Sequence, residues 1–340
     1  MKRVALIKGD GIGPEVIDAA LRVVEVLDPD VEFIPCDAGY EWWKEHGGPS
    51  YIPEDTWEVL RSTDACLKGP TTTVPDPKLP KSATVSIRQG LDLYANVRPI
   101  KTLPNPNAKA DLDFICVREN TEGLYSGLDF RISDELAISI RKVTKRSSLN
   151  VARYSYELLR DKGWSRLIVV NKANILKHSD GLFLEAVEEL HKDYPEVRVE
   201  RFFVDNMAQQ LVMNPTQFNR SVLLGSNLFM DIISELASGL LGGIGLVYSA
   251  NFGDDYAMFE PAHGTAPDIV GQNKANPTAA VLSAAWLLEY LGERDEARSI
   301  FEAVYEVYRE GLHLTPDLGG EASTSEMTEA IVEKLKGLNR

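Results

Sequence analysis

Short runs in which every residue is apolar constrain the fold of this chain more than any other feature. Residues 4–7 read Val-Ala-Leu-Ile, residues 114–117 read Phe-Ile-Cys-Val, and residues 167–170 read Leu-Ile-Val-Val. Such runs are typical of parallel strands that helices cover on both faces. Helices are expected between them, the first beginning at Pro14, another at residues 54–62 and a further one from residue 150. A strand is also expected at residues 31–35. Residues 258–269 are expected to form one long loop before a helix that has Asn276 as its N-cap and Pro277 as its first residue. We therefore predict an α/β fold, and 340 residues are enough for about two domains.

The glycine loop after the first strand resembles part of a dinucleotide-binding motif. Gly9 and Gly11 follow that strand, and Pro14 stands three residues further on. The Rossmann fingerprint G-x-G-x-x-G requires its third glycine at that position. Proline is instead a common first residue of a helix. The loop therefore predicts an ordinary turn from strand to helix, and not a true Rossmann fold.

The charge of the chain limits its partners. It carries 36 basic and 51 acidic residues, a net charge of −15. Nucleic acids and anionic membranes need a basic face, so we expect neither as a partner. Neither a membrane span nor a signal peptide is expected. The three cysteines have neither disulfide-framework numbers nor zinc-site spacing, which indicates reduced thiols and a cytoplasmic location. An acidic ligand would have to meet a local cluster of arginines.

Two acidic side chains stack on a helix predicted at residues 227–239. Asp231 and Glu235 lie four residues apart, one helical turn from each other, where two carboxylates repel. A hard divalent ion such as Mg²⁺ or Mn²⁺ would relieve this repulsion. A solvated acidic face is the commoner explanation of such spacing, so the pair alone leaves both possibilities open.

Other charged groups follow predicted strands or recur between apolar residues. Arg88, Arg98 and Arg118 would suit a polycarboxylate if they converge, because a guanidinium binds a carboxylate through two parallel hydrogen bonds. Lys172 and Asp205 stand at the carboxyl ends of strands, where open α/β folds place reactive groups. Taken singly, each of these residues is more often an ordinary surface residue.

Residues 126–143 have alternating apolar positions, which predicts a hairpin arm that could hold a second subunit.

Together these segments resemble the β-decarboxylating dehydrogenases that act on malates substituted at carbon 3, which include isocitrate, isopropylmalate, homoisocitrate and tartrate dehydrogenases. The resemblance covers essentially the whole chain and rests on seven motifs in the same order. The motifs are Gly9-Asp-Gly-Ile-Gly-Pro-Glu15, Asp92-Leu-Tyr-Ala-Asn-Val-Arg-Pro99, Arg118-Glu-Asn-Thr-Glu-Gly123, Lys172-Ala-Asn174, Asn227-Leu-Phe-x-Asp231, Glu260-Pro-x-His-Gly-Thr-Ala-Pro-Asp268 and Asn276-Pro-Thr.

The resemblance implies a two-domain isopropylmalate-dehydrogenase-like fold. The larger, cofactor-binding domain would comprise residues 1–98 and 249–340, from both chain ends. The smaller domain, residues 99–248, would carry substrate and metal ligands and the arm of a dimer. The implied assembly is a homodimer with shared active sites, with a higher oligomer as the alternative.

The implied reaction is oxidation of a hydroxy-polycarboxylate by a nicotinamide cofactor, followed by loss of CO₂. Mg²⁺ or Mn²⁺ would be held by Asp205, Asp231 and Glu235, with Asp205 and Lys172 coming from the partner subunit. Lys172 would accept the hydroxyl proton, if its pKa is lowered by burial near the metal, and Tyr125 would protonate the enol carbon. The substrate-binding residues implied are Ser82, Thr84, Val85, Arg88, Arg98, Arg118, Tyr125, Lys172 and Asp205.

The resemblance also implies NAD as the cofactor, because Asp268 suits the free ribose 2′-hydroxyl and would repel the phosphate of NADP. The cofactor residues implied are Thr71, Thr72, Glu260, His263, Gly264, Thr265, Ala266, Asp268, Ile269 and Asn276.

The part of the pocket that selects the substrate is polar. Ser82 and Thr84, with Val85, stand where isopropylmalate enzymes present leucines, and hydroxyls favour a third carboxylate, as in isocitrate or homoisocitrate. Two positions depart from the family pattern: Met230 replaces glycine, which would add bulk beside the cation, and Glu235 replaces aspartate. The alternatives are therefore 3-isopropylmalate dehydrogenase and a non-catalytic regulatory homologue.

Overall fold

A computed structural model describes residues 1–338 and shows that strands across this range form one ten-stranded sheet, in the order β2-β1-β3-β12-β11-β4-β5-β10-β8-β9. The strands are β1 (Lys2–Ile7), β2 (Val31–Pro35), β3 (Ala65–Lys68), β4 (Ala95–Lys101), β5 (Asp113–Glu119), β8 (Arg166–Asn171), β9 (Arg198–Phe203), β10 (Val222–Gly225), β11 (Tyr248–Phe252) and β12 (Ala257–Pro261).

The sheet is parallel towards both ends and antiparallel in the middle. β1 pairs in parallel with β2 and β3, and β10 pairs in parallel with β5 and β8. Between these groups, β11 runs antiparallel to β12 and β4, and β4 runs antiparallel to β5. Strands from both chain ends therefore lie on one side of the antiparallel centre. The predicted α/β class is confirmed.

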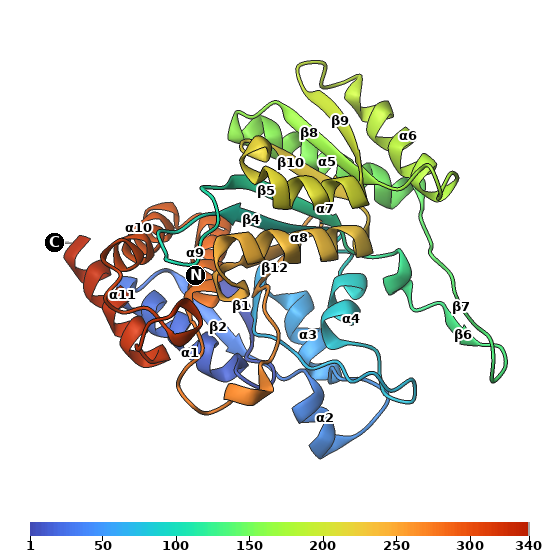
Figure 1. Cartoon of the computed structure of the whole chain (residues 1–340). Coiled ribbons are helices and arrows are strands. Elements are labelled where there is room, and N and C mark those ends of the chain that lie inside the picture. Colours follow the sequence, from blue (N-terminus) through green and yellow to red (C-terminus); the bar gives the residue numbers. More distant parts are fainter. Residues whose placement is uncertain (339–340) are drawn as a thin grey trace.

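Helices cover both faces of the sheet (Figure 1). They are α1 (Gly13–Val24), α2 (Tyr40–His46), α3 (Glu54–Ser62), α4 (Ala83–Gly90), α5 (Lys145–Lys162), α6 (Ser179–His191), α7 (Val204–Met213), α8 (Asn227–Leu241), α9 (Thr278–Leu291), α10 (Arg294–Glu310) and α11 (Thr324–Leu338). None of the helices within residues 1–338 combines the length and apolar character that crossing a bilayer needs. The predicted domain boundaries pass through β4 and the start of β11, at the centre of the sheet, and the division into domains stays a prediction.

The glycine loop joins backbone segments and does not resemble a phosphate cradle. Gly9 and Gly11 have φ values of +74° and +61°. A Cβ on Gly9 would lie 2.1 Å from the Pro70 carbonyl oxygen, and one on Gly11 would lie 2.3 Å from that of Thr265. Asp10, which is buried, accepts hydrogen bonds from three backbone amides, one of them that of Thr72 (2.7 Å). Glycine is needed here for close approach, which agrees with the predicted turn.

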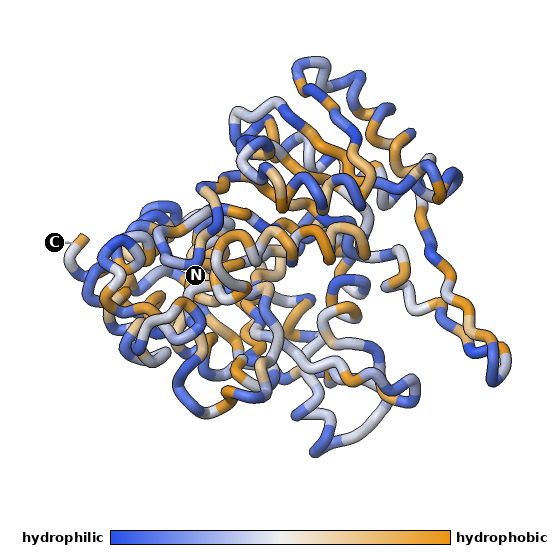
Figure 2. The backbone as a smooth tube through the Cα atoms, in the orientation of Figure 1, coloured by the Kyte–Doolittle hydropathy of each residue, from blue (hydrophilic) through white to orange (hydrophobic). Residues whose placement is uncertain are grey.

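The predicted hairpin arm is present as a separate two-stranded ribbon of β6 (Asp129–Arg131) and β7 (Ala137–Ser139), which projects away from the rest of the chain (Figure 1). Its apolar side chains are exposed, and Figure 2 shows hydrophobic positions along its length. They are Leu128, Phe130, Ile132, Leu136, Ile138 and Ile140, each 37% to 57% exposed. The arm has no packing partner within the described residues that would bury this surface.

Several local predictions were wrong. Residues 258–269 were expected to form one long loop, but residues 257–261 are strand β12, which pairs with β3 and β11 in the middle of the sheet. The helix expected from residue 150 begins at Lys145, because the Thr144 hydroxyl accepts a hydrogen bond from the Ser147 amide (3.3 Å) and caps it earlier. Met230, which replaces the glycine of the family pattern, has its side chain fully buried in the core, and its effect on a bound cation stays a prediction.

Candidate active site

The acidic pair on α8 lies against two of the three predicted arginines. Arg98, from β4, donates a hydrogen bond to Glu235 Oε1 (2.9 Å) and lies 3.6 Å from Asp231 Oδ1. Arg118, from the end of β5, forms an ion pair with Asp231 Oδ1. Both arginines are almost completely buried. Their charges offset the repulsion between the two stacked carboxylates.

Tyr125 completes this cluster from the short 3-10 helix Leu124–Ser126. Its hydroxyl donates to Asp231 Oδ2 (2.5 Å), and its ring lies 4.8 Å from the Arg118 guanidinium. Burial, reinforced by the hydrogen bond to Asp231, raises the pKa of Tyr125. Burial opposes ionisation of Asp231, but Arg118, Tyr125 and Arg98 outweigh it and lower the pKa of Asp231. The phenol is therefore a proton donor and the carboxyl an anion near neutral pH.

Helix α4 brings the predicted selectivity residues onto the same side as the third arginine. Ser82 immediately precedes the helix, and Thr84 lies four residues before Arg88, one turn away. The Thr84 hydroxyl shares a hydrogen bond with the Thr71 hydroxyl (3.0 Å). Val85 is half-buried beside them. The Thr84 hydroxyl and the Arg88 guanidinium therefore lie on one side of α4 and line the same cavity.

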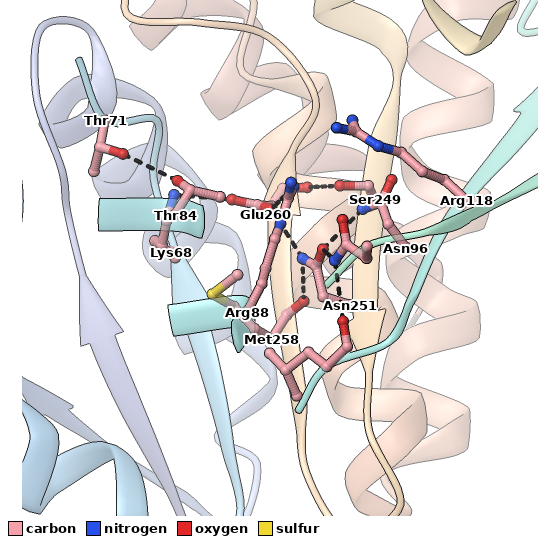
Figure 3. Close-up of polar contacts among 12 residues, drawn as sticks. Lys68, Thr71, Thr84, Arg88, Asn96, Arg118, Ser249, Asn251, Met258 and Glu260 are labelled. Carbon is pink, nitrogen blue, oxygen red and sulfur yellow. Dashed lines mark hydrogen bonds and ion pairs between the residues drawn. The ribbon is translucent and has the colours of Figure 1, made fainter. Parts of the chain in front are cut away.

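Glu260 anchors Arg88 through a buried network (Figure 3). Its carboxylate accepts hydrogen bonds from Arg88 Nη2 (2.9 Å), Lys68 Nζ (2.8 Å) and Asn251 Nδ2 (2.8 Å). Burial alone would raise the pKa of Glu260, but Lys68 and Arg88 lower it to about 2. The structure thus gives Glu260, which the sequence assigned to the cofactor, contacts that orient Arg88.

One cavity of about 120 Å³ joins Arg88 and Arg98 to the predicted cofactor loops. It is lined by Lys68, Pro70, Thr71, Thr84, Arg88, Arg98, Ser249, Glu260, Pro261, Ala262, His263 and Gly264. Two buried nitrogen atoms of lining residues, Arg88 Nε and His263 Nε2, have no hydrogen-bond partner in the described chain. Buried polar groups are normally paired, so both atoms fit a bound polar ligand.

The histidine has a defined hydrogen-bonding direction. His263 Nδ1 lies 2.9 Å from the Gly264 carbonyl oxygen, which can only accept, so Nδ1 donates. Burial lowers the pKa of His263. In the neutral ring the unpaired Nε2 is then an acceptor, which suits an amino group such as that of adenine.

The remaining cofactor candidates lie on the loop after β12 and at the start of α9. Thr265 is bridged to the glycine loop, since its carbonyl accepts from the Ile12 amide (3.0 Å), and its hydroxyl accepts from the Thr72 hydroxyl (3.4 Å). Ala266 has a φ of +40° and precedes the short helix Pro267–Ile269, in which Asp268 is exposed. The Asp268 carboxylate has no hydrogen bond or ion pair to any residue in the range 1–338.

Asn276 has a structural role in addition to its predicted position near the cofactor. Its Oδ1 accepts from the amide of Thr278 (3.0 Å), and α9 begins at Thr278 with Pro277 at the N-cap, one residue later than expected. Its Nδ2 donates to Asp317 Oδ2 (3.1 Å).

Lys172 and Asp205 form a second cluster at the ends of β8 and β9. Lys172 Nζ lies 2.7 Å from Asp205 Oδ1 and 5.6 Å from the centre of the Phe203 ring. The hydrogen bond from Lys172 lowers the pKa of Asp205. The Asp205 side chain is 67% exposed, so this cluster faces outward and is accessible to another chain.

The predicted metal ligands do not all meet within one chain. Among residues 1–338, no three His, Cys, Asp or Glu side chains gather as a metal-binding group. Asp231 and Glu235 lie together, whereas Asp205 pairs with Lys172. The donor chemistry nevertheless fits, because carboxylate oxygens are preferred ligands of Mg²⁺ and Mn²⁺. One more carboxylate, supplied by a second copy, would complete the predicted set.

Sequence reasoning missed the residues that hold the predicted ones in place. Lys68 is 1% exposed and pairs with Glu260, Asn251 bridges Glu260 and Asn96, and Asp317 holds Asn276. An apolar strand that ends in a lysine was the only signal for Lys68. Nothing in the local sequence indicated Asn251 or Asp317.

The site combines arginines, a phenol and an acidic pair on a mixed α/β sheet, and it adjoins the loops predicted to bind the cofactor. This combination defines a dehydrogenase that acts on hydroxy acids. The sequence profile of the isocitrate/isopropylmalate dehydrogenase family matches residues 3–331. The chain belongs to that family, and the prediction that it is one of these dehydrogenases is confirmed.

Individual relatives match the chain over nearly its full length. It is 46% identical to an isocitrate/homoisocitrate dehydrogenase of Thermus thermophilus over 338 residues, which is 99% of each chain. It is 40% identical to a 3-isopropylmalate dehydrogenase of Methanothermobacter thermautotrophicus, covering 98% of each chain. The crystal structure of isocitrate dehydrogenase from Methylococcus capsulatus superimposes with a TM-score of 0.94 at 42% identity, covering 99% of this chain and 100% of the other.

Proposed function

We propose that this enzyme catalyses NAD-dependent, metal-dependent oxidative decarboxylation of a malate whose substituent at carbon 3 carries a carboxylate, with isocitrate or homoisocitrate as the substrate. The observation that carries the proposal is that Arg88 and Arg98 share one cavity with the hydroxyl of Thr84 and with His263. Guanidinium groups and hydroxyls suit carboxylates, and the adjoining loops suit an adenosine.

The arginines have different parts in binding. Arg88 is fixed by Glu260 at Nη2 and has an unpaired Nε, so it would present an already oriented donor to a substrate carboxylate. Arg98 and Arg118 would exchange contacts with Asp231 and Glu235 for contacts with the substrate. Thr84 would reach the third carboxylate. An arginine that is already oriented loses less conformational entropy when substrate binds.

NAD would accept the hydride and Mg²⁺ or Mn²⁺ would withdraw electrons from the substrate oxygen when both are bound. Asp231 and Glu235, with Asp205 of a second copy, are the residues that would hold the cation. Lys172 Nζ would take the hydroxyl proton. The Tyr125 hydroxyl, protonated near neutral pH, would give a proton to carbon after CO₂ leaves.

The choice of NAD rests on Asp268, an exposed carboxylate without a partner in the described chain. It can accept hydrogen bonds from ribose hydroxyls, and it would repel a phosphate at the 2′ position.

A homodimer fits the same observations. The exposed apolar side chains of the arm need a partner, and the outward-facing Lys172–Asp205 pair lies apart from Asp231 and Glu235 within one chain. Each copy would then supply Lys172 and Asp205 to the other.

A panel of isocitrate, homoisocitrate and 3-isopropylmalate, assayed by NADH absorbance with NAD or NADP and with or without Mn²⁺, tests this proposal. The expected result is the highest kcat/KM with NAD, Mn²⁺ and a tricarboxylate. A preference for 3-isopropylmalate would overturn the argument from the hydroxyl groups. No turnover on any member of the panel would favour a regulatory homologue.

A further inference from the structure

Asp180, on the first turn of α6, is a buried acid that the proposed reaction does not use. It is 2% exposed. Its Oδ2 accepts a hydrogen bond from the backbone amide of Lys172 (2.6 Å), and its Oδ1 forms an ion pair with Arg141 Nη2 (2.6 Å). One carboxylate therefore connects the lysine at the end of β8 to the root of the arm.

The hydrogen bond from Lys172 to Asp180 closes a short, tightly bonded turn. The Lys172 carbonyl accepts from the amides of Ile175 and Leu176, both at 2.9 Å, and the Leu176 carbonyl accepts from the Asp180 amide (3.0 Å). The Lys172 backbone is thus held at both its amide and its carbonyl. Its side chain points from this fixed base towards Asp205.

Arg141 lies two residues beyond β7, where the arm rejoins the rest of the chain (Figure 1). Its Nη1 donates to the Ser179 hydroxyl (2.7 Å), and its guanidinium lies 5.3 Å from the centre of the Phe229 ring on α8. The next residue, Lys142, exchanges backbone hydrogen bonds with Gly123, two residues before Tyr125. The arm root is therefore connected to α8 and α6.

We propose that Asp180 and Arg141 are positioning residues. When the arm of one chain packs against a second copy, they fix the position of Lys172 relative to that arm, and so place Lys172 in the active site of the second copy. The inference rests on the proposed function, in which Lys172 serves the partner. A buried carboxylate that loses its arginine is strongly disfavoured, so Asp180 keeps Arg141 and the Lys172 backbone in fixed positions relative to each other. A shift of about 1 Å in a reacting group can lower a rate about 100-fold.

Two substitutions of Asp180 distinguish its hydrogen bond with the Lys172 amide from its ion pair with Arg141. Asp180→Ala removes both, whereas Asp180→Asn keeps an acceptor for the Lys172 amide and loses the charge that pairs with Arg141. We expect kcat of Asp180→Ala to fall about 100-fold, with KM for substrate and NAD changed by less than about threefold. Asp180→Asn should retain an intermediate kcat. Glu188→Gln, which breaks an exposed pair on the same helix, is the matched control and should leave kcat unchanged.

A mixed dimer shows in which active site Asp180 acts. A chain with Asp180→Ala is co-expressed with a chain carrying Tyr125→Phe, under different affinity tags, and the heterodimer is isolated. If Asp180 places the lysine of the neighbouring site, one site contains an intact Tyr125 and a correctly placed Lys172. The heterodimer should then recover about half of the wild-type activity, although both parent homodimers are impaired. A heterodimer no more active than its parents would overturn the inference.

Further measurements keep failure of this inference distinct from failure of the proposed function. Lys172→Met paired with Tyr125→Phe should also recover about half of the activity. If the heterodimer of Lys172→Met with Tyr125→Phe recovers activity but the Asp180→Ala homodimer has wild-type kcat, Asp180 is not a positioning residue and the proposed function stands. If Lys172→Met itself is fully active, the role proposed for the lysine is wrong. Should Asp180→Ala fail to fold, the kcat of Asp180→Asn decides, and a value equal to wild type counts against the coupling.

Discussion

Replacing Glu260 with glutamine should destabilise the protein in a manner that depends on pH. The Glu260 carboxylate lies 2.8 Å from Lys68 Nζ and 2.9 Å from Arg88 Nη2, and the side chains of Lys68, Arg88 and Glu260 are 1%, 9% and 7% exposed. Glutamine fits the same space but leaves two buried cations without their counter-ion. Breaking a buried pair in this way costs about 3–5 kcal/mol.

The corresponding shift in melting temperature follows from the size of the chain. The unfolding entropy is about 2.1 cal/mol/K per residue, so the 340 residues give about 0.7 kcal/mol/K. A loss of 3–5 kcal/mol should therefore lower Tm by about 4–7 °C. Glu329→Gln is the matched control, because Glu329 pairs with Arg22 at 3.0 Å in an exposed position. It should lower Tm by at most about 1.5 °C.

The sign of the pH effect follows from the direction of the pKa shift. The pKa of Glu260 is lowered from 4.5 to about 2 in the folded chain. The stabilisation is therefore fully present above the unfolded value of 4.5 and is lost as pH falls towards about 2. Calorimetric melting at pH 7, 5, 4 and 3 should show the difference between wild type and Glu260→Gln shrinking below about pH 4.5. A difference independent of pH, or no larger than that of Glu329→Gln, would refute this reasoning.

The remaining predictions concern catalysis. Lys172→Met and Tyr125→Phe should each lower kcat by about 10²–10⁴-fold with an unchanged circular dichroism spectrum, and near-wild-type rates would remove the proposed roles. Asp268→Lys should shift the ratio of kcat/KM for NAD and NADP towards NADP, and an unchanged ratio in steady-state assays would contradict the assignment. Thr84→Val should lower kcat/KM for isocitrate more than for 3-isopropylmalate, and an equal loss on both would exclude a selective role. Chelation of divalent ions should abolish turnover. Isocitrate should raise the affinity of the protein for Mn²⁺ in titration calorimetry, and equal Mn²⁺ affinities with and without isocitrate would contradict coupled binding of substrate and metal.

Local patterns predicted the elements whose burial follows from their own sequence. The strand at residues 31–35 and the helix at residues 54–62 have the predicted bounds. The strand β12 was missed because its Glu260 and Pro261 resemble loop residues. Glu260 is tolerated in a fully buried strand because Lys68 and Arg88 come to it from elsewhere in the chain. A pattern within a short window contains no information about such distant partners.

The same limit applies to the active site. Arg98 and Asp231 could be identified as charged residues with a family motif around them, but their mutual contact depends on β4 lying beside α8. The spacing of Asp231 and Glu235 left open whether a cation or solvent faces the two carboxylates, whereas in one chain the neutralising charges belong to Arg98 and Arg118. Only the tertiary structure shows that these two arginines lie against the acidic pair.

This neutral cluster gives a reason for coupled binding. Two guanidinium groups and two carboxylates balance one another without a ligand. An anionic substrate alone would draw Arg98 and Arg118 away and leave the two carboxylates repelling each other. A divalent cation alone would occupy the carboxylates and leave two buried arginines unpaired. When both bind, each charge finds a partner, so each ligand should strengthen the binding of the other by the same factor. The arginines that we propose to bind the substrate would thus also keep the acidic pair stable in its absence.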